Sequence, residues 1–252
     1  MNIAIIGHGK MGRMIEKIAI GRGHNICCIV EDGEADKFSS PEFKNADVAI
    51  DFTVPSAEPG NIYRCFEAGV PVVCGTTGWQ EGLPEVRHRA ELGEGTLLWS
   101  SNFSIGVNIF RAVNRYLARI MDSEPQYTPE ELEVHHIHKL DHPSGTAVTL
   151  AEEIIAQTER LTSWKDIGTE GGHDEADKRG MALDGIMPVE YRREGEVPGI
   201  HTIRWSSPQD SITLTHNANS REGFALGAVI AAEFLKGKTG FHTMDQVFTW
   251  TE

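Results

Sequence analysis

The feature of this chain that most constrains its fold is a set of three glycines directly after a short apolar run. Ile3–Ile6 is followed at once by Gly7, Gly9 and Gly12, in the spacing G-x-G-x-x-G. At the start of a chain, this order predicts a strand that enters a glycine turn and then a helix. Such a turn lets the backbone approach a pyrophosphate, which lies at the positive N-terminus of the helix.

The residues that follow complete a dinucleotide-binding unit. Arg13–Ile20 has the apolar spacing of a helix, and Gly21 and Gly23 are expected to end it. Ile26–Val30 is predicted to be a second buried strand, with Glu31 at its end. An acid at this place accepts hydrogen bonds from the adenine-ribose hydroxyls of a dinucleotide. The alternative, a bare structural turn, is weakened because strand, turn, helix, strand and acid occur together.

The cofactor preference depends on three charged residues. Glu31 is followed by Asp32, and two carboxylates would repel the 2′-phosphate of NADPH. Lys10, inside the glycine turn, would offset part of that repulsion. We therefore predict NADH or NADPH as the cofactor, with a preference for NADH.

The alternation of strands and helices continues to about residue 103. Strands are expected at 48–52, 71–74 and 96–99, and helices at 57–68 and 85–92. This order indicates a parallel sheet, whose ligands lie at the carboxyl ends of the strands. The loops Gly75–Thr77 and Ser100–Phe103 follow two of these strands. They are candidate nucleotide contacts, although Thr76, Thr77 and Ser100 would also serve as plain turn caps.

The second half of the chain has a different pattern. A helix is expected at 106–121, and strands of an antiparallel or mixed sheet within 188–204 and at 211–216. Residues 163–185 are rich in glycine and charge, and we expect mostly exposed loop there. A last helix is predicted at 221–236. The fold class is therefore α/β, with a Rossmann-type parallel domain and a second α+β domain that has a mixed sheet.

The richest chemistry lies between residues 133 and 147. Four histidines, a lysine and two carboxylates precede Pro143-Ser144-Gly145-Thr146, which predicts a helix start. As a strand, the segment would place Glu133, His135 and Lys139 on one face, with Leu132 and Val134 toward a core. As a helix, it would still place His135 and Lys139 together, four residues apart.

Three interpretations of this segment compete. A metal site is one, but no H-x-x-x-H helix or cysteine pairing supports it, and Lys139 would repel a cation. A set of surface or satisfied histidines is the second. The third is a site for an anionic substrate, in which the N–H groups of Ser144, Gly145 and Thr146 bind a carboxylate and His135 acts as a general acid. The third interpretation fits best beside a nicotinamide site, so no metal is predicted.

Composition narrows the possible partners and the location. The chain has 252 residues and a formal net charge of −14, which argues against nucleic acid or an anionic membrane surface as a partner. No apolar run approaches the roughly 20 residues that span a bilayer. The first residues do not resemble a signal peptide. The four cysteines show no metal-type spacing, so we expect a reduced, cytoplasmic protein.

The chain resembles the dihydrodipicolinate reductase (4-hydroxy-tetrahydrodipicolinate reductase) family over nearly its whole length. The most specific match is Glu133-x-His135-x-x-x-Lys139-x-Asp141-x-Pro143-Ser-Gly-Thr-Ala147. The other matching segments are Gly7–Gly12, Asp51–Thr53, Gly75–Gly78, Asn102–Asn108, Arg193–His201 and Ser220–Arg221.

The resemblance implies a reaction and a set of roles. Hydride from NADH or NADPH would reach ring C4 of a cyclic imine dicarboxylate, on the diaminopimelate route to lysine. His135 would be the proton donor and Lys139 the second catalytic residue, and substrate carboxylates would contact His136, Ser144, Gly145 and Thr146. The cofactor would contact Gly7, His8, Gly9, Lys10, Met11, Gly12, Glu31, Gly75, Thr76, Thr77, Ser100, Ser101, Asn102 and Phe103.

The resemblance also implies an organisation. Residues 1–103 and 221–252 would form the dinucleotide-binding domain, and residues 104–220 a substrate-binding domain whose sheet builds a homotetramer. The chain departs from many members of the family at Lys10, where they have an arginine, and at Asp32, where they have a basic residue. It is also short around residues 33–45, where we expect a trimmed loop.

Two other functions remain in competition. One is a homoserine or aspartate-semialdehyde dehydrogenase, of which the latter needs a catalytic cysteine. Cys74 precedes a glycine loop, but no partner histidine is evident. The other is a non-catalytic nucleotide sensor, for which a basic DNA-binding segment would be expected and which gives no reason for the pair His135 and Lys139.

Overall fold

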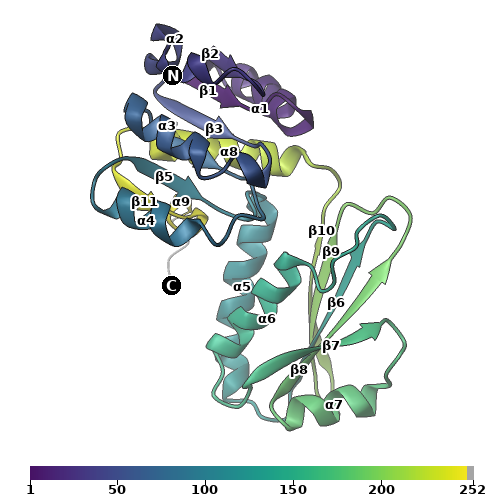
Figure 1. Ribbon diagram of the computed structural model, residues 1–252. Coiled ribbons are helices and arrows are strands. Elements are labelled where there is room, and N and C mark those ends of the chain that lie inside the picture. The colour runs from purple at the N-terminus through teal and green to yellow at the C-terminus, as the bar shows by residue number, and fades with distance from the viewer. Residues whose placement is uncertain (249–252) are drawn as a thin grey trace. The chain divides into compact units, whose positions relative to one another are not determined.

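The computed structural model describes residues 1–248 and divides them into two compact units. The first consists of residues 1–105 together with the segment from Arg221 onward, and the second consists of residues 106–220. Each unit has its own sheet (Figure 1). In the part of the chain that the structure describes, no helix is both long and apolar enough to span a bilayer.

The sheet of the first unit is parallel throughout and has the strand order β11-β5-β4-β3-β1-β2. Its strands are β1 (Asn2–Ile6), β2 (Asn25–Val30), β3 (Val48–Asp51), β4 (Val72–Cys74), β5 (Thr96–Trp99) and β11 (Gly240–His242). The chain passes from β1 to β2 on one side and to β3 on the other. The carboxyl ends of β1 and β3 therefore lie at the point where the strand order reverses, which is where such sheets bind ligands.

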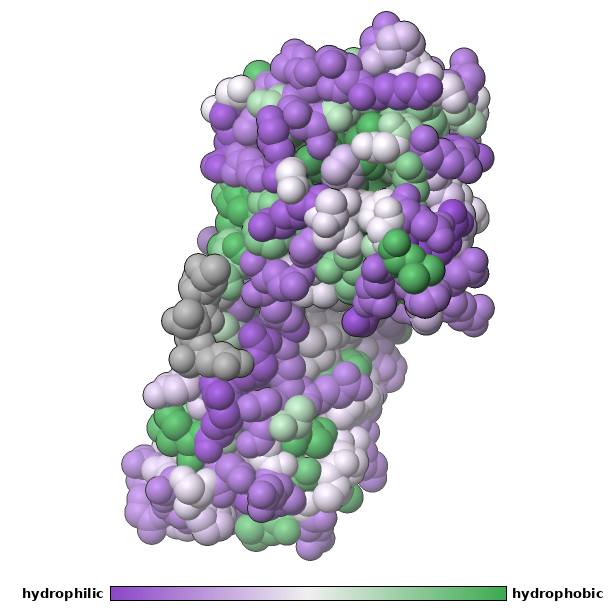
Figure 2. Space-filling model, turned by 90° about the vertical axis from the view of Figure 1, so that its left-hand side faces the viewer, coloured by the Kyte–Doolittle hydropathy of each residue, from purple (hydrophilic) through white to green (hydrophobic). Residues whose placement is uncertain are grey.

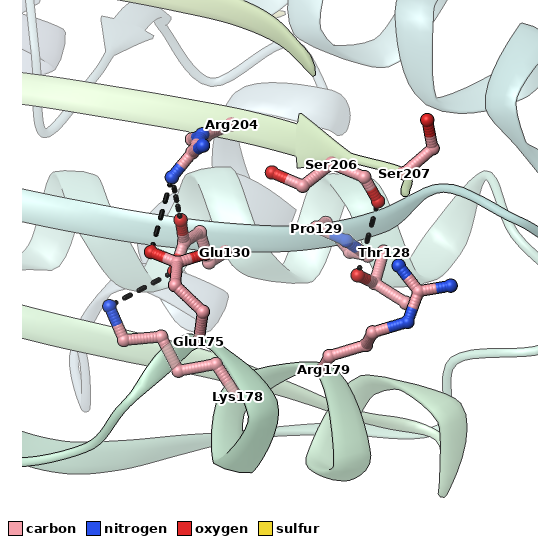
Figure 3. A pocket seen from close by; sticks show the side chains of 9 residues that line it. All are labelled: Thr128, Pro129, Glu130, Glu175, Lys178, Arg179, Arg204, Ser206 and Ser207. Atoms are coloured by element: carbon pink, nitrogen blue, oxygen red, sulfur yellow. Dashed lines mark hydrogen bonds and ion pairs between the residues drawn. The ribbon is translucent and has the colours of Figure 1, made fainter. Parts of the chain in front are cut away.

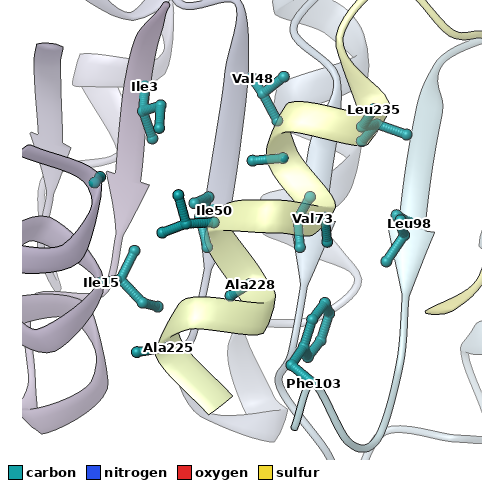
Figure 4. Packing of buried hydrophobic residues seen from close by; sticks show 14 of the residues in the cluster. Ile3, Ile15, Val48, Ile50, Val73, Leu98, Phe103, Ala225, Ala228 and Leu235 are labelled. Carbon is teal, nitrogen blue, oxygen red and sulfur yellow. The ribbon is translucent and has the colours of Figure 1, made fainter. Parts of the chain in front are cut away.

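Helices cover both faces of this sheet. They are α1 (Lys10–Gly21), α2 (Pro41–Lys44), α3 (Gly60–Ala68), α4 (Leu83–Glu91), α8 (Glu222–Leu235) and α9 (Met244–Val247), with the short 3-10 segments η1 (Ala35–Ser39) and η2 (Pro55–Ala57). On one face, α1 and α8 pack on Ile3, Ile50, Val73 and Leu98, as Figure 4 shows. On the other face, α2, α3, α4 and η1 enclose a second apolar core. The predicted α/β class is confirmed.

The structure corrects several sequence predictions in this unit. β2 was expected to be buried, but it is the edge strand, and most of its side chains are only half-buried. The helix predicted from residue 57 begins at Gly60, because residues 55–57 form the separate segment η2. The expected loop at 33–45 contains η1 and α2. The short elements β11 and α9 were not predicted, since three or four residues carry little periodicity.

The second unit has a mixed sheet with the strand order β10-β9-β6-β8-β7. β6 is parallel to β8 and antiparallel to β9, so the predicted mixed sheet is confirmed. The strands are β6 (Thr128–His135), β7 (Ser163–Thr169), β8 (Ile186–Arg193), β9 (Ile200–Ser206) and β10 (Ser211–Asn217). The helices are α5 (Ile105–Asp122), α6 (Gly145–Ala156) and α7 (Glu175–Leu183). Apolar side chains of α5 and α6 pack on one face of this sheet.

Residues 163–185, predicted as exposed loop, instead contain β7 and α7. β7 pairs only with β8 and is largely exposed, so its sequence lacks the apolar signal of a buried strand. The start of α7 is capped by the Asp174 side chain, which accepts a hydrogen bond from the N–H of Asp177. Short, polar elements at a sheet edge are therefore hard to distinguish from loops by their amino-acid composition.

The facing of β6 was predicted wrongly for Leu132, although Val134 is buried as expected. Leu132 was expected toward the core, but it is half-exposed, whereas the carboxylates Glu131 and Glu133 are 1% and 0% exposed. The register partners of Glu131 are Val189 and Ile203, which belong to the core under α5 and α6, and Glu133 lies on the same face of the strand. β6 therefore turns two acids toward the helices.

Most of the molecular surface is polar on the face drawn in Figure 2. Hydrophilic residues cover most of that face, and hydrophobic residues lie in small separate groups. This distribution agrees with the acidic composition and with the enclosure of the large apolar side chains in the cores.

Candidate active site

The carboxylate of Glu133 is the centre of the candidate site in the second unit. Its side chain is 0% exposed and has three neighbours. The N–H of Ser144 donates to Oε2 at 3.1 Å, and Nη2 of Arg193 donates to Oε1 at 3.1 Å. Nδ1 of His135 lies 3.3 Å from Oε2, close enough for an ion pair but without the alignment of a hydrogen bond.

These neighbours keep Glu133 ionised. Burial by itself would raise the pKa of Glu133, but its contacts with His135, with the Ser144 N–H and with Arg193 outweigh that effect. The result is a pKa of about 2. At neutral pH the site therefore has a fixed negative charge directly behind the His135 imidazole.

Arg193 joins this carboxylate to the loop that follows β6. Its Nε donates to the backbone oxygen of Lys139 at 3.2 Å, and its Nη2 donates to that of Asp141 at 2.7 Å. The Lys139 ammonium is 2.7 Å from Oδ2 of Asp141 and 2.9 Å from Oδ1. The guanidinium thus connects the strand that carries His135 to the loop that carries Lys139.

Lys139 was predicted to share a strand with His135, but it does not. β6 ends at His135, and the chain turns where the N–H of Lys139 donates to the backbone oxygen of His136 at 3.1 Å. The N–H of Ile137 donates to the backbone oxygen of Gly195, in the connection between β8 and β9, so the strand pairing of β6 does not continue to Lys139. Both residues still contact one network, which runs through Glu133, Arg193 and Asp141.

A second histidine lies against His135. The rings of His135 and His201 are 5.3 Å apart in an edge-on arrangement, and Nδ1 of His201 is 3.2 Å from Oε1 of Glu131. Burial, with His135 nearby, lowers the pKa of His201 to about 3, so its imidazole is neutral. A side chain at Gly199 would meet Nε2 of His135 at 3.0 Å, so the glycine keeps room for the His135 ring.

The other histidines of the segment have separate environments. His136 is half-buried, and its ring lies 5.9 Å from that of His138. His138 is exposed and pairs with Glu196 at 2.9 Å. His142 pairs with Asp166 at 2.7 Å and stacks on Tyr191. Of the four histidines, His135 is the one placed against a buried carboxylate.

The predicted helix start is present, with one correction. The Ser144 hydroxyl caps α6 by accepting from the N–H of Ala147. The Ser144 N–H, however, was predicted to bind substrate and instead donates to Glu133. A backbone donor that is buried finds a partner within the protein when one is near. Gly145 is exposed and Thr146 is half-buried, so these two positions form the outer part of the helix start.

Glu133, His135 and His201 also form the kind of trio that binds metals. Their ligand atoms all lie within 4.8 Å of one another. Both oxygens of Glu133 already accept hydrogen bonds, however, and one of the donors is the Arg193 cation. A guanidinium 3.1 Å from the carboxylate repels a metal ion and balances the charge in its place. The chemistry of this trio therefore favours an ion-pair network.

A pocket of about 180 Å³ lies at the opposite end of β6 (Figure 3). Its residues are Thr128, Pro129, Glu130, Glu175, Lys178, Arg179, Arg204, Ser206 and Ser207. Lys178 pairs with Glu130 at 3.1 Å and with Glu190 at 2.8 Å, and Arg204 contacts Glu130 and Glu175. Two of its cations, Lys178 and Arg204, are thus paired with carboxylates, which reduces the attraction of this pocket for an anion.

The glycine turn of the first unit is built for close approach. Gly7 has φ +83°, and a Cβ there would lie 2.5 Å from the backbone oxygen of Phe52. A Cβ at Gly12 would lie 2.0 Å from the oxygen of Gly7. Gly9, at the N-terminus of α1, has nothing within 4 Å of its Cβ position. Gly7 and Gly12 therefore serve packing, and Gly9 leaves the helix start open.

The remaining residues of this turn point in different directions. His8 is tied to Glu16 of α1 at 2.7 Å. Lys10 is exposed beside Gly9, whereas Met11 packs against the apolar core. Of the three side chains, Lys10 is the one available to an anion.

Glu31 and Asp32 are exposed at the end of β2, as expected. The N–H of Glu31 donates to Oε2 of Glu34 at 2.9 Å. Lys37 lies 2.6 Å from the same oxygen and also donates to the backbone oxygen of Ile29. The cation nearest the two acids is therefore already paired.

The two loops predicted at the sheet edge are present but differ in exposure. Thr76 is 4% exposed, and its hydroxyl accepts a hydrogen bond from the N–H of Thr53 at 3.0 Å. Thr77 is exposed, and a Cβ at Gly75 would lie 2.2 Å from the Phe52 ring. Ser100 to Phe103 form a tight turn closed by the Ser100 hydroxyl, with Ser101 exposed, Asn102 half-buried and Phe103 in the core.

Sequence reasoning missed the residues that organise these sites. Glu133 was noted as facing the site and as the start of the most specific match, but without a role, and Arg193 and His201 only as parts of a matching segment. The signal that could have found Arg193 and His201 is the alternation of side chains along β8 and β9. It places both residues on the face of the sheet that carries Glu133. Of the two buried acids beside Thr76, Asp51 was noted only as part of a matching segment and Glu58 was not singled out.

Comparison with known proteins identifies the family. The family model described as "Dihydrodipicolinate reductase, N-terminus" matches residues 1–103, and the one described as "Dihydrodipicolinate reductase, C-terminus" matches residues 106–248. The chain belongs to the dihydrodipicolinate reductase family. It is thus an oxidoreductase of a family that depends on pyridine nucleotides.

Relatives of this reductase family match the chain from end to end. A 4-hydroxy-tetrahydrodipicolinate reductase of Christiangramia forsetii is 43% identical over 249 residues, covering 99% of this chain and 98% of that protein. The protein of the same name from Archaeoglobus fulgidus is 36% identical, covering 97% and 98%.

A solved structure shares the fold. The dipicolinate-bound dihydrodipicolinate reductase of Paenisporosarcina sp. TG-14 has a TM-score of 0.75 at 21% identity, with 96% of this chain and 97% of that one covered.

Proposed function

We propose that this reductase converts 4-hydroxy-tetrahydrodipicolinate (dihydrodipicolinate) to tetrahydrodipicolinate with NADH or NADPH, in lysine biosynthesis through diaminopimelate. The observation that carries the proposal is the network of Glu133, Arg193, His135 and Lys139 in a chain of this family. It combines an imidazole against an ionised carboxylate with cations suited to a dicarboxylate.

The first unit fits a nicotinamide dinucleotide. The open helix start at Gly9 accepts a pyrophosphate, and the exposed Lys10 adds a positive charge. We assign Glu31 to the adenine ribose, and the loops Gly75–Thr77 and Ser100–Phe103 to the rest of the cofactor. When bound, the nicotinamide supplies the hydride to ring C4 of the substrate.

Substrate carboxylates have the N-terminus of α6 to bind in the second unit. We assign them to His136 and to the outer positions of the α6 start, Gly145 and Thr146. The inner N–H, that of Ser144, anchors Glu133 and so keeps this helix start in register with His135. Ser144 therefore acts on the substrate through position rather than contact.

Protonation at ring C3 is the step assigned to His135. The ionised Glu133, 3.3 Å from Nδ1, stabilises the imidazolium that precedes transfer. His201 stays neutral beside it and adds no second charge. Lys139, held by Asp141, is assigned as the second catalytic residue, which stabilises negative charge as the ring is reduced.

Cofactor choice follows from the end of β2. Glu34 engages both Lys37 and the Glu31 N–H, which removes two groups that would otherwise bind a 2′-phosphate. We therefore expect NADH to be preferred.

Replacing Glu31 by alanine should weaken the binding of NADH by about tenfold, as for loss of one or two charged hydrogen bonds, and the binding of NADPH by less. Direct titration with each nucleotide measures the two constants, and an equal loss for both would move the ribose contact elsewhere.

Two further properties follow from the family resemblance and stay predictions. They are a homotetramer built through the sheet of the second unit and a cytoplasmic location. The sedimentation of the purified protein measures the first.

A competing function receives no support from its key residue. An aspartate-semialdehyde dehydrogenase requires a nucleophilic thiolate, but Cys74 is 0% exposed. Burial raises the pKa of the Cys74 thiol well above its usual value, with Glu58 and Asp51 adding to the effect. A buried neutral thiol is not a nucleophile.

The deciding experiment is an oxidation assay with NADH and NADPH in parallel. The unstable substrate is generated in the cuvette from pyruvate and aspartate semialdehyde by the preceding synthase. Substrate-dependent oxidation, abolished when the synthase is omitted, supports the proposal. Folded protein that binds nucleotide but oxidises neither cofactor would refute it.

A further inference from the structure

Two acids are buried side by side at the carboxyl end of β3. Asp51 is 0% exposed and Glu58 is 7% exposed. Within residues 1–248, neither carboxyl forms an ion pair with a lysine, arginine or histidine. Two buried negative charges without a cation are strongly unfavourable, because the low dielectric penalises each charge and their repulsion.

The hydrogen-bond donors around the two acids are too few for two carboxylates. The Thr53 hydroxyl lies 2.9 Å from Oδ1 of Asp51 and 3.3 Å from Oε1 of Glu58, and it has one proton to donate. The Thr76 hydroxyl lies 3.5 Å from Oδ1 of Asp51, and the buried Asn61 amide, which also donates to the Thr53 hydroxyl at 3.5 Å, is a further donor near Asp51. Oδ2 of Asp51 and Oε2 of Glu58 are buried without any partner. One added proton supplies the missing donor.

The surroundings agree with this count. Burial, together with the charge of Asp51, raises the pKa of Glu58 to about 9. The other titratable groups that interact with the two acids are the thiols of Cys65 and Cys74, and both have pKa values raised well above normal by burial. Arg64 is exposed on α3, where it contacts Asn61 at 3.5 Å. Among the described residues, none of these neighbours therefore supplies a positive charge that would neutralise the second carboxylate in place of a proton.

The pair supports both nucleotide loops. The N–H of Thr53 donates to the Thr76 hydroxyl at 3.0 Å, which joins the end of β3 to the Gly75–Thr77 loop. A Cβ at Gly7 would meet Cγ2 of Thr53 at 2.7 Å, so the pyrophosphate turn rests directly on Thr53. Thr76 is fixed from its other side, since its backbone oxygen accepts from the Trp79 indole at 2.8 Å.

We propose that Asp51 and Glu58 share a single proton and act as a positioning pair, which fixes Thr53 and Thr76 beneath the two nucleotide loops. The proposal rests on the dinucleotide binding proposed above. Loss of the shared proton places a second negative charge under these loops. That charge pushes the carboxyls apart, displaces the threonines and repels the pyrophosphate.

The test is nucleotide binding as a function of pH, measured by NADH fluorescence from pH 6.5 to 9.5. Wild-type affinity should fall by about fivefold or more between pH 7.5 and 9.5, as expected for coupling between a proton site and a ligand site. Glu58→Gln keeps a neutral partner for Asp51 at every pH, so its affinity should stay at the wild-type pH 7.5 value throughout. Glu67→Gln is the matched control, since it removes an exposed acid of α3 and should follow the wild type.

Asp51→Asn gives an independent check if the first variant does not fold. It also limits the pair to one negative charge, so the alkaline loss of affinity should again be absent. Folding of each variant is verified by circular dichroism at every pH. Wild type and Glu58→Gln with the same alkaline loss would overturn the pair proposal alone. Wild-type protein that binds neither NADH nor NADPH at pH 7.5 would overturn the cofactor assignment and this proposal together.

Discussion

Each unit of this reductase buries carboxyl groups near the carboxyl end of a strand, and the two units balance the charge in opposite ways. In the second unit, Glu133 has a cation, a backbone N–H and an imidazole around it, and its pKa is held at about 2. In the first unit, Asp51 and Glu58 have neutral hydroxyl and amide groups around them in place of a cation, and the pKa of Glu58 rises to about 9. Burial is similar, so the partners decide the protonation state.

The difference matches the two tasks proposed for the two sites. In the proposed mechanism, the fixed negative charge behind His135 stabilises the imidazolium that donates its proton in each turnover. A neutral or singly charged pair beneath the nucleotide loops avoids repelling an anionic cofactor. The same side-chain type therefore serves proton transfer in one unit and positioning in the other.

The largest expected effect is the loss of turnover when the His135 imidazole is replaced. Replacing His135 by glutamine should lower kcat by roughly 10²–10⁴-fold, as for loss of a general acid. Nucleotide affinity should change little, because the glycine turn belongs to the other unit. The measurement is the coupled oxidation assay together with NADH titration. The control is His138→Gln, an exposed histidine paired with Glu196, which should retain turnover. Near-normal kcat in His135→Gln would remove His135 from the mechanism.

The next effect tests the ion-paired carboxylate. Replacing Arg193 by methionine leaves Glu133 buried without its cation, which should cost about 3 kcal/mol of unfolding free energy at pH 7. Glu133 has a lowered pKa, so its stabilising contribution is present above pH 4.5 and is lost as the pH falls toward 2. The difference between variant and wild type should therefore shrink below pH 4.5.

Denaturant unfolding at pH 7 and pH 4 measures this effect. Arg192→Met, which removes the exposed neighbouring arginine, is the control. Adding Glu133→Gln to Arg193→Met should recover part of the loss, since the unpaired charge is gone. A loss as small as that of Arg192→Met would show that Arg193 does not balance Glu133.

The third effect is a change in the pH dependence of stability, and it tests the protonated pair. Glu58 has a raised pKa, so the stability it contributes is present below pH 4.5 and declines as the pH rises toward 9. Between pH 6 and 9, Glu58→Gln should be less sensitive to pH than the wild type, by about 1 kcal/mol per pH unit for one proton. Denaturant unfolding across this range measures the slopes, with Glu67→Gln as the reference. Parallel slopes in wild type and Glu58→Gln would contradict the shared proton.

The sequence predicted the fold well where its signals are local and strong. The glycine turn at Gly7–Gly12, the apolar strands and the helix start at Ser144 are set by short-range periodicity and capping. It predicted poorly the elements whose residues face solvent, namely β7 and α7, because a polar edge strand does not differ from a loop in composition.

The sequence by itself determined the fold class, the nucleotide turn and the identity of the histidine segment as a candidate site. Tertiary structure alone decided which acids are ionised and which residues support them. Glu133 and Arg193 are 60 residues apart in the chain. Asp51 contacts Thr76 because the strands that precede them in the chain, β3 and β4, are neighbours in the sheet. A carboxyl's charge depends on the donors that surround it in space. That surrounding is assembled by strand pairing and burial, which local sequence does not specify.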